Sequence, residues 1–392
     1  MATVVLKPGR DQRLRGGYLW IFAGEIARIE GDVQVGDVVD VRSARGQWVG
    51  RGLVNPQSAL TVRLLTVQRE EIDREFFRRR IQEALDYRAR WAASWQAVRV
   101  VYGEADRLPG LIVDRYGDVV VVQTVTAGMD LRREMLAEVL EEVLQPAAIY
   151  ERNDAPVRRL EGLPERAGWL RGERPPLVEV AEGPARWAVD VARGQKTGFY
   201  LDQRENRLAV AARCRGAEVL DVFCYTGAFA IQAALAGAAR VVGVDISADA
   251  LAHARRHAEM NGVAGLCTFS EANAFDELRR LAAAGARFDV VILDPPPFAR
   301  SRDAVERALA GYKEINLRAM KLLRPGGLLV TCSCSHHVGE DLLLSVVADA
   351  AADARRAVRL VESRGQAADH PVHPAMLETG YLTCLLVEVR PR

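Results

Sequence analysis

The second half of the chain alternates apolar runs with charged segments, and this alternation constrains the fold more than any other feature. The apolar runs include AEVLDVF, RVVGVD, FDVVIL and LLVTCS, and the segments between them have apolar residues at helical spacing. Continuous apolar strands separated by helices are typical of a parallel sheet that is covered by helices on both faces. We therefore expect an α/β fold with a doubly wound sheet over residues 188–392.

The first half of the chain predicts two smaller modules. Residues 1–68 contain short runs such as VVDVR and LTVRLLTV, which alternate as strands do and are broken by Gly, Pro and Asn; this pattern favours a small β-barrel. A helix is predicted from Ile72 to about Trp95, followed by a hairpin around Gly117, a second helix over 129–144 and another strand. Residues 69–187 are therefore expected to form a central α/β module.

Composition restricts the class of protein. A chain of 392 residues that is 49% apolar and 27% charged can build two or three packed cores. It contains no uncharged apolar run of about 18 residues and no signal-peptide pattern, so we expect a soluble, cytoplasmic protein outside the membrane. Its six cysteines are too sparse for a disulfide framework. A net charge of +1 argues against a generally basic nucleic-acid binder, although Lys7, Arg10, Arg13 and Arg15 form a local basic cluster.

Polar residues follow the ends of the first three strands predicted for the sheet. Asp221 precedes a turn in which Gly227 is the only glycine, so the three-glycine dinucleotide fingerprint is absent and a cofactor without phosphates is favoured. Asp245 ends the second strand, where a carboxylate accepts the hydroxyls of a ribose, and Asn273 and Ala274 follow the third. Each tip alone also fits an ordinary turn or helix cap, but the three together predict a nucleoside pocket.

The fourth strand ends in Asp294, Pro295, Pro296, Pro297 and Phe298. Consecutive prolines stop strand pairing and keep the backbone extended. We expect Asp294 to hydrogen-bond a planar base and Phe298 to stack on one. A rigid loop with a helix-capping acid is the alternative.

The fifth strand leads into LVTCSCSHHV, which holds two cysteines and two histidines. Zinc binding by Cys332, Cys334, His336 and His337 is one interpretation, but structural zinc sites favour Cys-x-x-Cys pairs and a second, distant ligand pair, which this sequence lacks. We therefore expect no metal. A redox pair is not indicated either, and Cys332 is expected to be a buried core residue beneath Cys334.

The last 200 residues resemble the class I S-adenosylmethionine-dependent methyltransferases in DVFCYTG, VDIS, EANA and LLRPGGLLV. The segments GQKTGFYLDQREN (194–206), DPPPF, GYKEIN and SCSHH resemble, more narrowly, the bacterial 23S rRNA cytosine-5 methyltransferases with an N-terminal PUA domain. WIFAGEI and GLVNP extend this resemblance to the whole chain. It implies a PUA-like RNA-binding domain at 1–68, a central α/β module at 69–187 and a Rossmann-like methyltransferase domain at 188–392.

The resemblance also implies an activity and a set of site residues. The implied reaction is formation of 5-methylcytosine in 23S rRNA with S-adenosylmethionine, through a covalent bond from Cys334 to carbon 6 and with Asp294 at the base. The residues implied for the cofactor are Lys196, Thr197, Gly198, Tyr200, Asp202, Arg204, Asp221, Phe223, Tyr225, Thr226, Gly227, Asp245, Ile246, Asn273, Ala274 and Asp294. Those implied for the substrate are Pro295, Pro296, Phe298, Lys313, Asn316 and His336.

Several alternatives stay open. Pro297 stands where many RNA cytosine-5 methyltransferases have a second cysteine, so the base that removes the carbon-5 proton is open among His336, Ser335 and water. Methylation of a guanine or an amino group without covalent catalysis is the second enzymatic interpretation, and a non-catalytic RNA-binding assembly factor is the third. The implied partner is 23S rRNA or a large-subunit assembly intermediate; the modified nucleotide and homodimerisation are undetermined.

Overall fold

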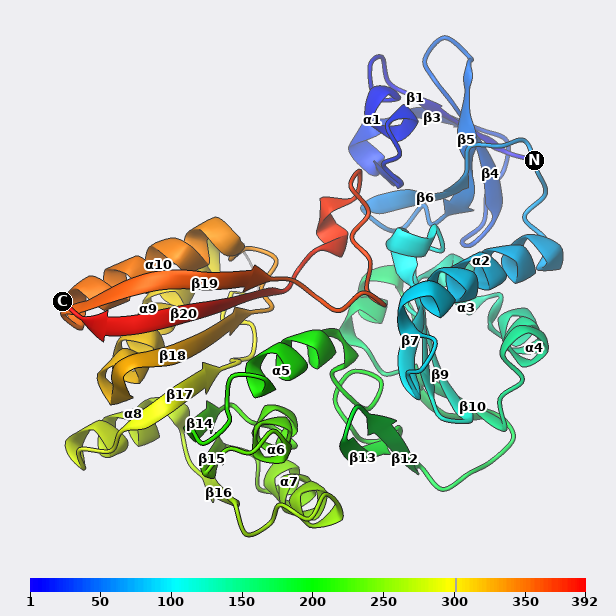
Figure 1. Ribbon diagram of the computed structural model, residues 1–392. Helices are drawn as coiled ribbons and strands as arrows, with labels where there is room; N and C mark the ends of the chain where they lie inside the picture. Colours follow the sequence, from blue (N-terminus) through cyan, green and yellow to red (C-terminus); the bar gives the residue numbers. More distant parts are fainter. Residues whose placement is uncertain (300–301) are drawn as a thin grey trace. The chain divides into compact units, whose positions relative to one another are not determined.

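The computed structural model describes residues 1–299 and 302–392, which fold into two compact units (Figure 1). Unit 1 comprises Met1–Val180, Val189–Leu201 and Ala368–Thr379. Unit 2 comprises Ala181–Ala188, Asp202–Ala367 and Gly380–Arg392. Each unit therefore combines segments that lie far apart in the sequence.

The N-terminal part of unit 1 is a six-stranded sheet with strand order β2-β6-β5-β4-β1-β3. Its elements are β1 (Thr3–Leu6), α1 (Gln12–Arg15), β2 (Trp20–Phe22), β3 (Ile26–Glu30), β4 (Val38–Arg42), β5 (Trp48–Val54) and β6 (Leu60–Thr66). Val39 and Val41 of β4 are buried and alternate with half-buried residues, which is the period-two pattern seen in the sequence. The expected small β domain at the N-terminus is confirmed.

The rest of unit 1 contains a five-stranded sheet with strand order β11-β10-β9-β8-β7. Its elements are α2 (Arg74–Ala92), β7 (Ala97–Tyr102), β8 (Leu111–Tyr116), β9 (Val119–Thr124), α3 (Ala127–Asp130), α4 (Arg133–Leu144), β10 (Ala148–Asn153) and β11 (Arg166–Arg171). Tyr116 and Val119 face each other at the tip of the predicted hairpin. The helix predicted over 129–144 is confirmed from Arg133 to Leu144, but its first residues belong to the separate helix α3. The guanidinium of Arg132 donates to the carbonyl of Gly128, which helps to end α3 before α4 begins.

Unit 2 is built on a seven-stranded sheet with strand order β16-β15-β14-β17-β18-β20-β19. Its strands are β14 (Glu218–Val222), β15 (Arg240–Asp245), β16 (Cys267–Glu271), β17 (Phe288–Leu293), β18 (Leu323–Ser333), β19 (Arg356–Arg364) and β20 (Thr383–Pro391). The strands from β16 to β18 pair in parallel, and β20 is antiparallel to both its neighbours. The chain builds outward from β14 to β16 and then returns to β17, so β14 and β17 flank a topological switch point, where ligands bind in such sheets.

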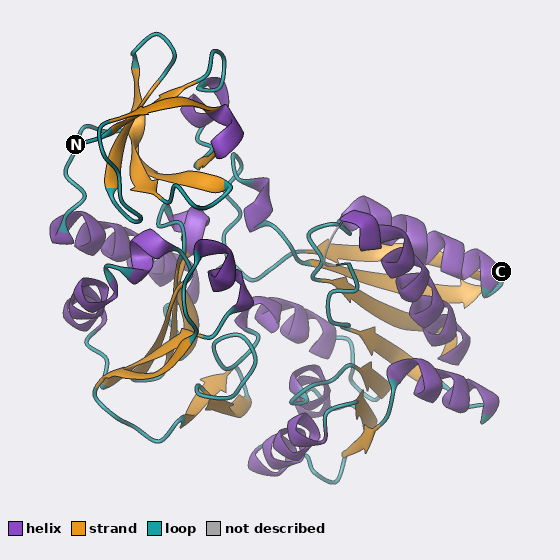
Figure 2. Cartoon of the chain, turned by 180° about the vertical axis from the view of Figure 1, so that it is seen from behind, coloured by secondary structure: helices purple, strands orange, loops and turns teal. Residues whose placement is uncertain are grey.

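Helices lie on both faces of this sheet (Figure 2). They are α5 (Arg204–Ala211), α6 (Ala228–Leu235), α7 (Ala248–Met260), α8 (Ala274–Ala283), α9 (Val305–Leu322) and α10 (Glu340–Asp353). Successive β17 residues from Val290 to Leu293 are all buried, although their side chains alternate between the two faces. The doubly wound α/β fold is thereby confirmed.

Two elements near the unit boundaries were not assigned as such from the sequence. The hairpin of β12 (Leu177–Glu182) and β13 (Ala185–Asp190) forms its own two-stranded sheet. Strand β19 is at the sheet edge and reads RAVRLVESR, in which charged residues interrupt the apolar pattern and hide the strand. Within the described ranges, 1–299 and 302–392, every helix is too short or too polar to cross a membrane.

Candidate active site

Three carboxylates lie at the carboxyl ends of neighbouring parallel strands in unit 2. Val222 of β14 pairs with Val244 of β15 and with Leu293 of β17. Asp245 and Asp294 therefore each come one residue after a partner of Val222, and Asp221 comes one residue before it. Parallel pairing thus brings together three acids that are distant in the sequence.

Asp221 is the most deeply buried of these acids, with 1% exposure. Its Oδ2 accepts a hydrogen bond of 3.0 Å from the N–H of Ala230 in α6. Its Oδ1 is buried and has no hydrogen-bond partner among the described residues. Burial, together with the charge of Asp294, raises the pKa of Asp221 well above its usual range. A buried carboxyl oxygen without a partner is costly, and a bound cationic or hydroxyl group would relieve that cost.

The turn after β14 has a strained backbone that faces the same edge. Phe223, Tyr225 and Gly227 have positive φ angles of 66°, 49° and 78°. The Asp245 carboxylate holds this turn, because its Oδ2 accepts from the N–H of Tyr225 at 2.8 Å and its Oδ1 accepts from the N–H of Ser247 at 2.9 Å. Each carboxylate oxygen can accept more than one hydrogen bond, so Asp245 retains acceptor capacity. Left-handed backbone at two non-glycine residues is a feature of functional turns.

A buried histidine supports this turn from within unit 2. The Nδ1 of His257 lies 3.0 Å from the carbonyl oxygen of Thr226, and its Nε2 lies 3.1 Å from the N–H of Ala188. The carbonyl oxygen of Thr226 can only accept, so the proton of the neutral ring is on Nδ1 and Nε2 accepts from the N–H of Ala188. Burial lowers the pKa of His257 below its ordinary value of 6.5. The His257 side chain therefore links the turn to the β12–β13 hairpin in its neutral form.

This depressed pKa predicts a pH-dependent stability. Below about pH 6.5 the unfolded chain binds a proton at His257 before the folded chain does, so the free energy of unfolding falls as the pH drops. In His257→Gln this contribution disappears, and the slope of stability between pH 6.5 and 5 is shallower by up to about 1.4 kcal/mol per pH unit. Urea unfolding at several pH values measures it. His337→Gln, in the segment after β18, is the control, and an unchanged slope in His257→Gln would contradict the prediction.

The predicted nucleophile and the predicted base-binding acid come from adjacent strand tips. Cys334 follows the end of β18, and its Sγ lies 3.8 Å from the carbonyl oxygen of Pro295, the residue after Asp294. Burial is the main cause that raises the pKa of Tyr312 of α9 to about 12, and interactions with Cys334 and Asp294 raise it further. Pro295 is buried, whereas Pro296 is exposed. The structure therefore brings Cys334 and Asp294 into one neighbourhood.

Cys332 lies deeper in the same strand, as predicted. It has no exposed surface and pairs across the sheet with Cys384 of β20. A hydrogen bond with Cys384, and burial, raise the pKa of the Cys332 thiol well above its usual range. In the described part of the chain no group of three His, Cys, Asp or Glu side chains is arranged to hold a metal ion.

The residues predicted to contact substrate occupy different environments. Phe298 packs on Tyr312, with ring centroids 4.8 Å apart, and its ring also neighbours those of Phe223 and Phe275. Lys313 forms an ion pair of 2.9 Å with Asp353 of α10. Substrate contact by these two side chains therefore remains a prediction.

Of three further predicted residues, two are held by short-range contacts and one is exposed. Asn316 is fully buried, its Nδ2 donates to the carbonyl oxygen of Tyr312, and its Oδ1 has no partner in the described ranges. Asn273 caps α8 by accepting from the N–H of Phe275 at 3.0 Å, and Ile246, beyond Asp245, is 70% exposed. Asn273 thus has a structural function whether or not it also contacts a cofactor.

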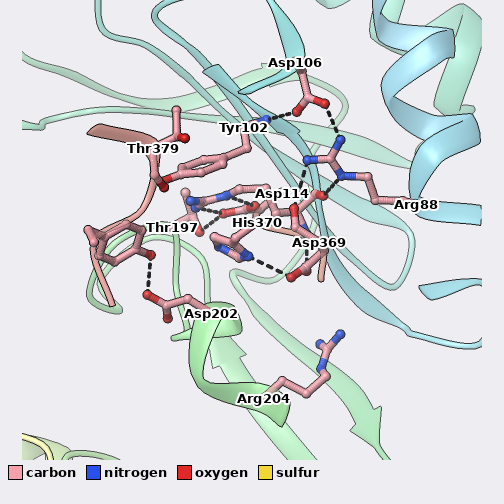
Figure 3. A network of polar contacts seen from close by, with 12 residues as sticks. Arg88, Tyr102, Asp106, Asp114, Thr197, Asp202, Arg204, Asp369, His370 and Thr379 are labelled. Atoms are coloured by element: carbon pink, nitrogen blue, oxygen red, sulfur yellow. Dashed lines mark hydrogen bonds and ion pairs between the residues drawn. The ribbon is translucent and has the colours of Figure 1, made fainter. Parts of the chain in front are cut away.

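The predicted cofactor segment 194–206 is divided between the two units. In unit 1, Thr197 is buried and contacts Asp114 and the hydroxyl of Tyr116, beside a network that includes Arg88 and Asp369 (Figure 3). Also in unit 1, the ammonium of Lys196 lies 4.6 Å from the ring centroid of Tyr200. An added Cβ at Gly198 would lie 2.7 Å from Val189, so only glycine fits there.

In unit 2, the same segment continues with Asp202 and Arg204. The phenol of Tyr381 donates to Asp202, and the ring of Tyr381 lies 5.7 Å from that of His336. Arg204 forms a buried ion pair of 3.0 Å with Glu182. Tyr381 was not predicted as a site residue, because its segment, GYL, carries no recognisable motif.

The fold and the acidic strand tips define a class I methyltransferase. Residues 130–380 match the S-adenosylmethionine-dependent methyltransferase family, and residues 4–67 match the PUA-like domain family. Proteins named Ribosomal RNA large subunit methyltransferase I are 44% identical in Shewanella denitrificans (98% of this chain, 99% of that protein) and 41% identical in Aeromonas hydrophila (99% and 100%). The chain belongs to this family of S-adenosylmethionine-dependent methyltransferases with an N-terminal PUA-like domain.

Solved structures agree on the fold. A protein described as a methyltransferase and complexed with SAH superposes with a TM-score of 0.86 over 99% of this chain and 100% of that chain. An S-adenosylmethionine-dependent methyltransferase from Streptococcus mutans gives 0.84 over the same shares. Both are 20% identical to this chain, so they show the fold alone.

The site residues fit the cofactor of this family. S-adenosylmethionine carries a sulfonium, an ammonium and a ribose diol, and the strand tips offer the unpartnered Oδ1 of Asp221 and the spare acceptor capacity of Asp245. Cations and hydroxyl donors are the groups that such carboxylates bind. The absence of a phosphate-binding glycine fingerprint is also consistent with this cofactor, which has no phosphate.

Proposed function

We propose that this chain methylates carbon 5 of a cytosine in 23S rRNA, with Cys334 as the nucleophile and Asp294 as the residue that binds the base. The observation that carries the proposal is the Cys334 thiol 3.8 Å from the carbonyl oxygen of Pro295, immediately after Asp294. A methyltransferase acting on a nitrogen that is already nucleophilic needs no thiol at this place.

The proposed chemistry requires both side chains. Carbon 5 of cytosine is a poor nucleophile; addition of the Cys334 thiolate to carbon 6 converts the ring to an enamine, with Asp294 hydrogen-bonded at ring nitrogen 3. Bound S-adenosylmethionine would supply an electrophilic methyl group, which carbon 5 of the enamine would take while the methyl–sulfur bond breaks and a neutral thioether leaves. A base then removes the carbon-5 proton, the bond from sulfur to carbon 6 breaks, and the thiolate leaves with its electron pair. His336, beside Tyr381, is the candidate for that base.

Two observations support ribosomal RNA as the substrate. The relatives that align over 98–99% of this chain carry the name of a large-subunit rRNA methyltransferase. The PUA-like domain presents exposed Lys7 and Arg10, whereas Arg13 and Arg15 are paired with Glu25 and Asp11. Positive charge on such a domain supplies contacts to phosphate.

The product distinguishes this function from its alternatives. Purified chain, 23S rRNA lacking modifications and labelled S-adenosylmethionine should yield 5-methylcytidine after nuclease digestion and mass spectrometry. A methylated guanosine or an amino-methylated base would overturn the carbon-5 assignment. Absence of any product, together with failure to bind S-adenosylmethionine by calorimetry, would favour a non-catalytic assembly factor.

A further inference from the structure

A series of hydrogen bonds through two buried amide side chains connects Asp294 to the far edge of the unit 2 sheet. Gln203 and Asn206, at the start of α5, are 3% and 1% exposed. The Nε2 of Gln203 donates to Oδ1 of Asp294 at 3.0 Å, and the Nδ2 of Asn206 donates to Oε1 of Gln203 at 2.7 Å. The Oδ1 of Asn206 accepts from Nε of Arg364, the last residue of β19, at 2.9 Å.

The contacts of Asn206 with Arg364 and Gly365 determine which group donates in every hydrogen bond of this series. A guanidinium can only donate, so the atom of Asn206 that faces Arg364 is its oxygen. The carbonyl oxygen of Gly365 can only accept, and it lies 3.0 Å from Nδ2 of Asn206, which requires the same orientation. Asn206 must then donate to Gln203, and Gln203 must donate to Asp294. The guanidinium of Arg364, which can only donate, and the carbonyl oxygen of Gly365, which can only accept, thus determine both amide orientations.

We propose that Gln203 is a positioning residue for Asp294, and that Asn206 and Arg364 hold its amide in the donating orientation. This inference rests on the function proposed above for Asp294. Because Oδ1 of Asp294 receives an N–H, any proton that Asp294 carries while it binds a base is on Oδ2. A donated hydrogen bond also favours the ionised form of this carboxylate.

The hydrogen bonds from Arg364 through Asn206 and Gln203 to Asp294 are called the relay below. Two variants change the relay without changing Asp294. Gln203→Met removes the donor and keeps the size of the side chain. In Asn206→Asp the new carboxylate still accepts from Arg364 but cannot donate, so the Gln203 amide turns and its oxygen faces Oδ1 of Asp294. That contact favours protonated Asp294. Of the other titratable groups near Asp294, Asp221 of β14, Tyr312 of α9 and Cys334 keep their contacts. The buried Cys332 of β18 loses a hydrogen bond from Gln203 that lowers the pKa of its thiol, and Asn206→Asp adds one carboxylate.

The test is single-turnover methyl transfer to RNA as a function of pH. We expect the rate to fall about 10- to 100-fold in both variants, with the Kd for S-adenosylmethionine within about threefold of wild type. The limb of the pH–rate profile that depends on Asp294 should move to higher pH in Gln203→Met and further in Asn206→Asp. Asn261→Asp, a matched change at the C-terminus of α7, should leave the rate and the profile unchanged.

A purely structural contribution would not give this order of shifts. A folded Gln203→Met protein with wild-type rates and an unshifted profile would overturn the proposal. If Asn206→Asp does not fold, the result for Gln203→Met is sufficient to test the proposal. Identification of the methylated nucleoside is a separate readout. A product other than 5-methylcytidine would refute the proposed function, whereas the order of the pH shifts would still report on the relay.

Discussion

Cys334→Ala is expected to abolish methyl transfer to RNA, with a rate loss of about 10³-fold or more, equivalent to roughly 4 kcal/mol of transition-state stabilisation. The thiol lies at the tip of β18 beside Pro295, and without it no group at this position can add to carbon 6. Binding of S-adenosylmethionine should be retained, because the acids of β14 and β15 are unaffected. Transfer of labelled methyl groups and calorimetry measure the two effects.

A trapped adduct provides the direct test of covalent catalysis. RNA that contains 5-fluorocytosine should remain bonded to the wild-type chain on a denaturing gel, because fluorine cannot leave carbon 5 as a proton does. Cys334→Ala should give no such band. Cys267→Ala removes a thiol from the first residue of β16, at the end of the strand that lies away from the acidic strand tips, and should behave as wild type. Full methylation by Cys334→Ala would move the assignment to a guanine or an amino group.

Glu182→Ala is expected to produce the largest loss of stability. Glu182 is 4% exposed and forms ion pairs with Arg204 at 3.0 Å and Arg207 at 2.6 Å, both fully buried arginines. Burial by itself would raise the pKa of Glu182, but the two arginines lower it below its usual range. Removal of the carboxylate leaves two buried cations facing each other, which costs about 3–5 kcal/mol.

Calorimetric unfolding measures this loss. For a unit of this size, 3–5 kcal/mol corresponds to a decrease of about 6–20 °C in Tm. Glu182→Gln keeps the shape and part of the hydrogen bonding and should be intermediate. Glu259→Ala, an exposed acid of α7, should change the Tm by less than about 2 °C. A Glu182→Ala protein as stable as wild type would show that the arginines find other partners.

Much of the fold was predictable because it depends on periodicity along the chain. The apolar strands of unit 2 are local signals, and the structure confirms them. Strand β19 was missed because an edge strand does not need a continuous apolar run. The break between α3 and α4 was missed because it involves a hydrogen bond from the side chain of Arg132 to the carbonyl of Gly128, and no sequence pattern predicts such a contact.

The site residues also differed in whether the sequence could predict them. Asp221, Asp245 and Asp294 could be predicted to meet, since parallel strands end at a common edge and each acid stands at a strand end. Gln203, Tyr381 and His257 could not, because each acts through a partner that is remote in the sequence: Asp294, Asp202 and Thr226. A motif is defined by the spacing of residues along the chain. A hydrogen bond between segments that are distant in the sequence has no characteristic spacing, so no motif reveals it.

The sequence by itself determined the doubly wound sheet and the acidic strand tips, which follow from hydrophobic periodicity and from the places where the apolar strands end. The choice of Cys334 over Cys332 as the candidate nucleophile came from the resemblance to the cytosine-5 methyltransferases. Only the tertiary structure decided that the segment 194–206 is shared between two units, and that Arg364 orients the amides leading to Asp294. Burial and hydrogen-bond direction are properties of packed neighbours, and the neighbours exist only once the chain has folded.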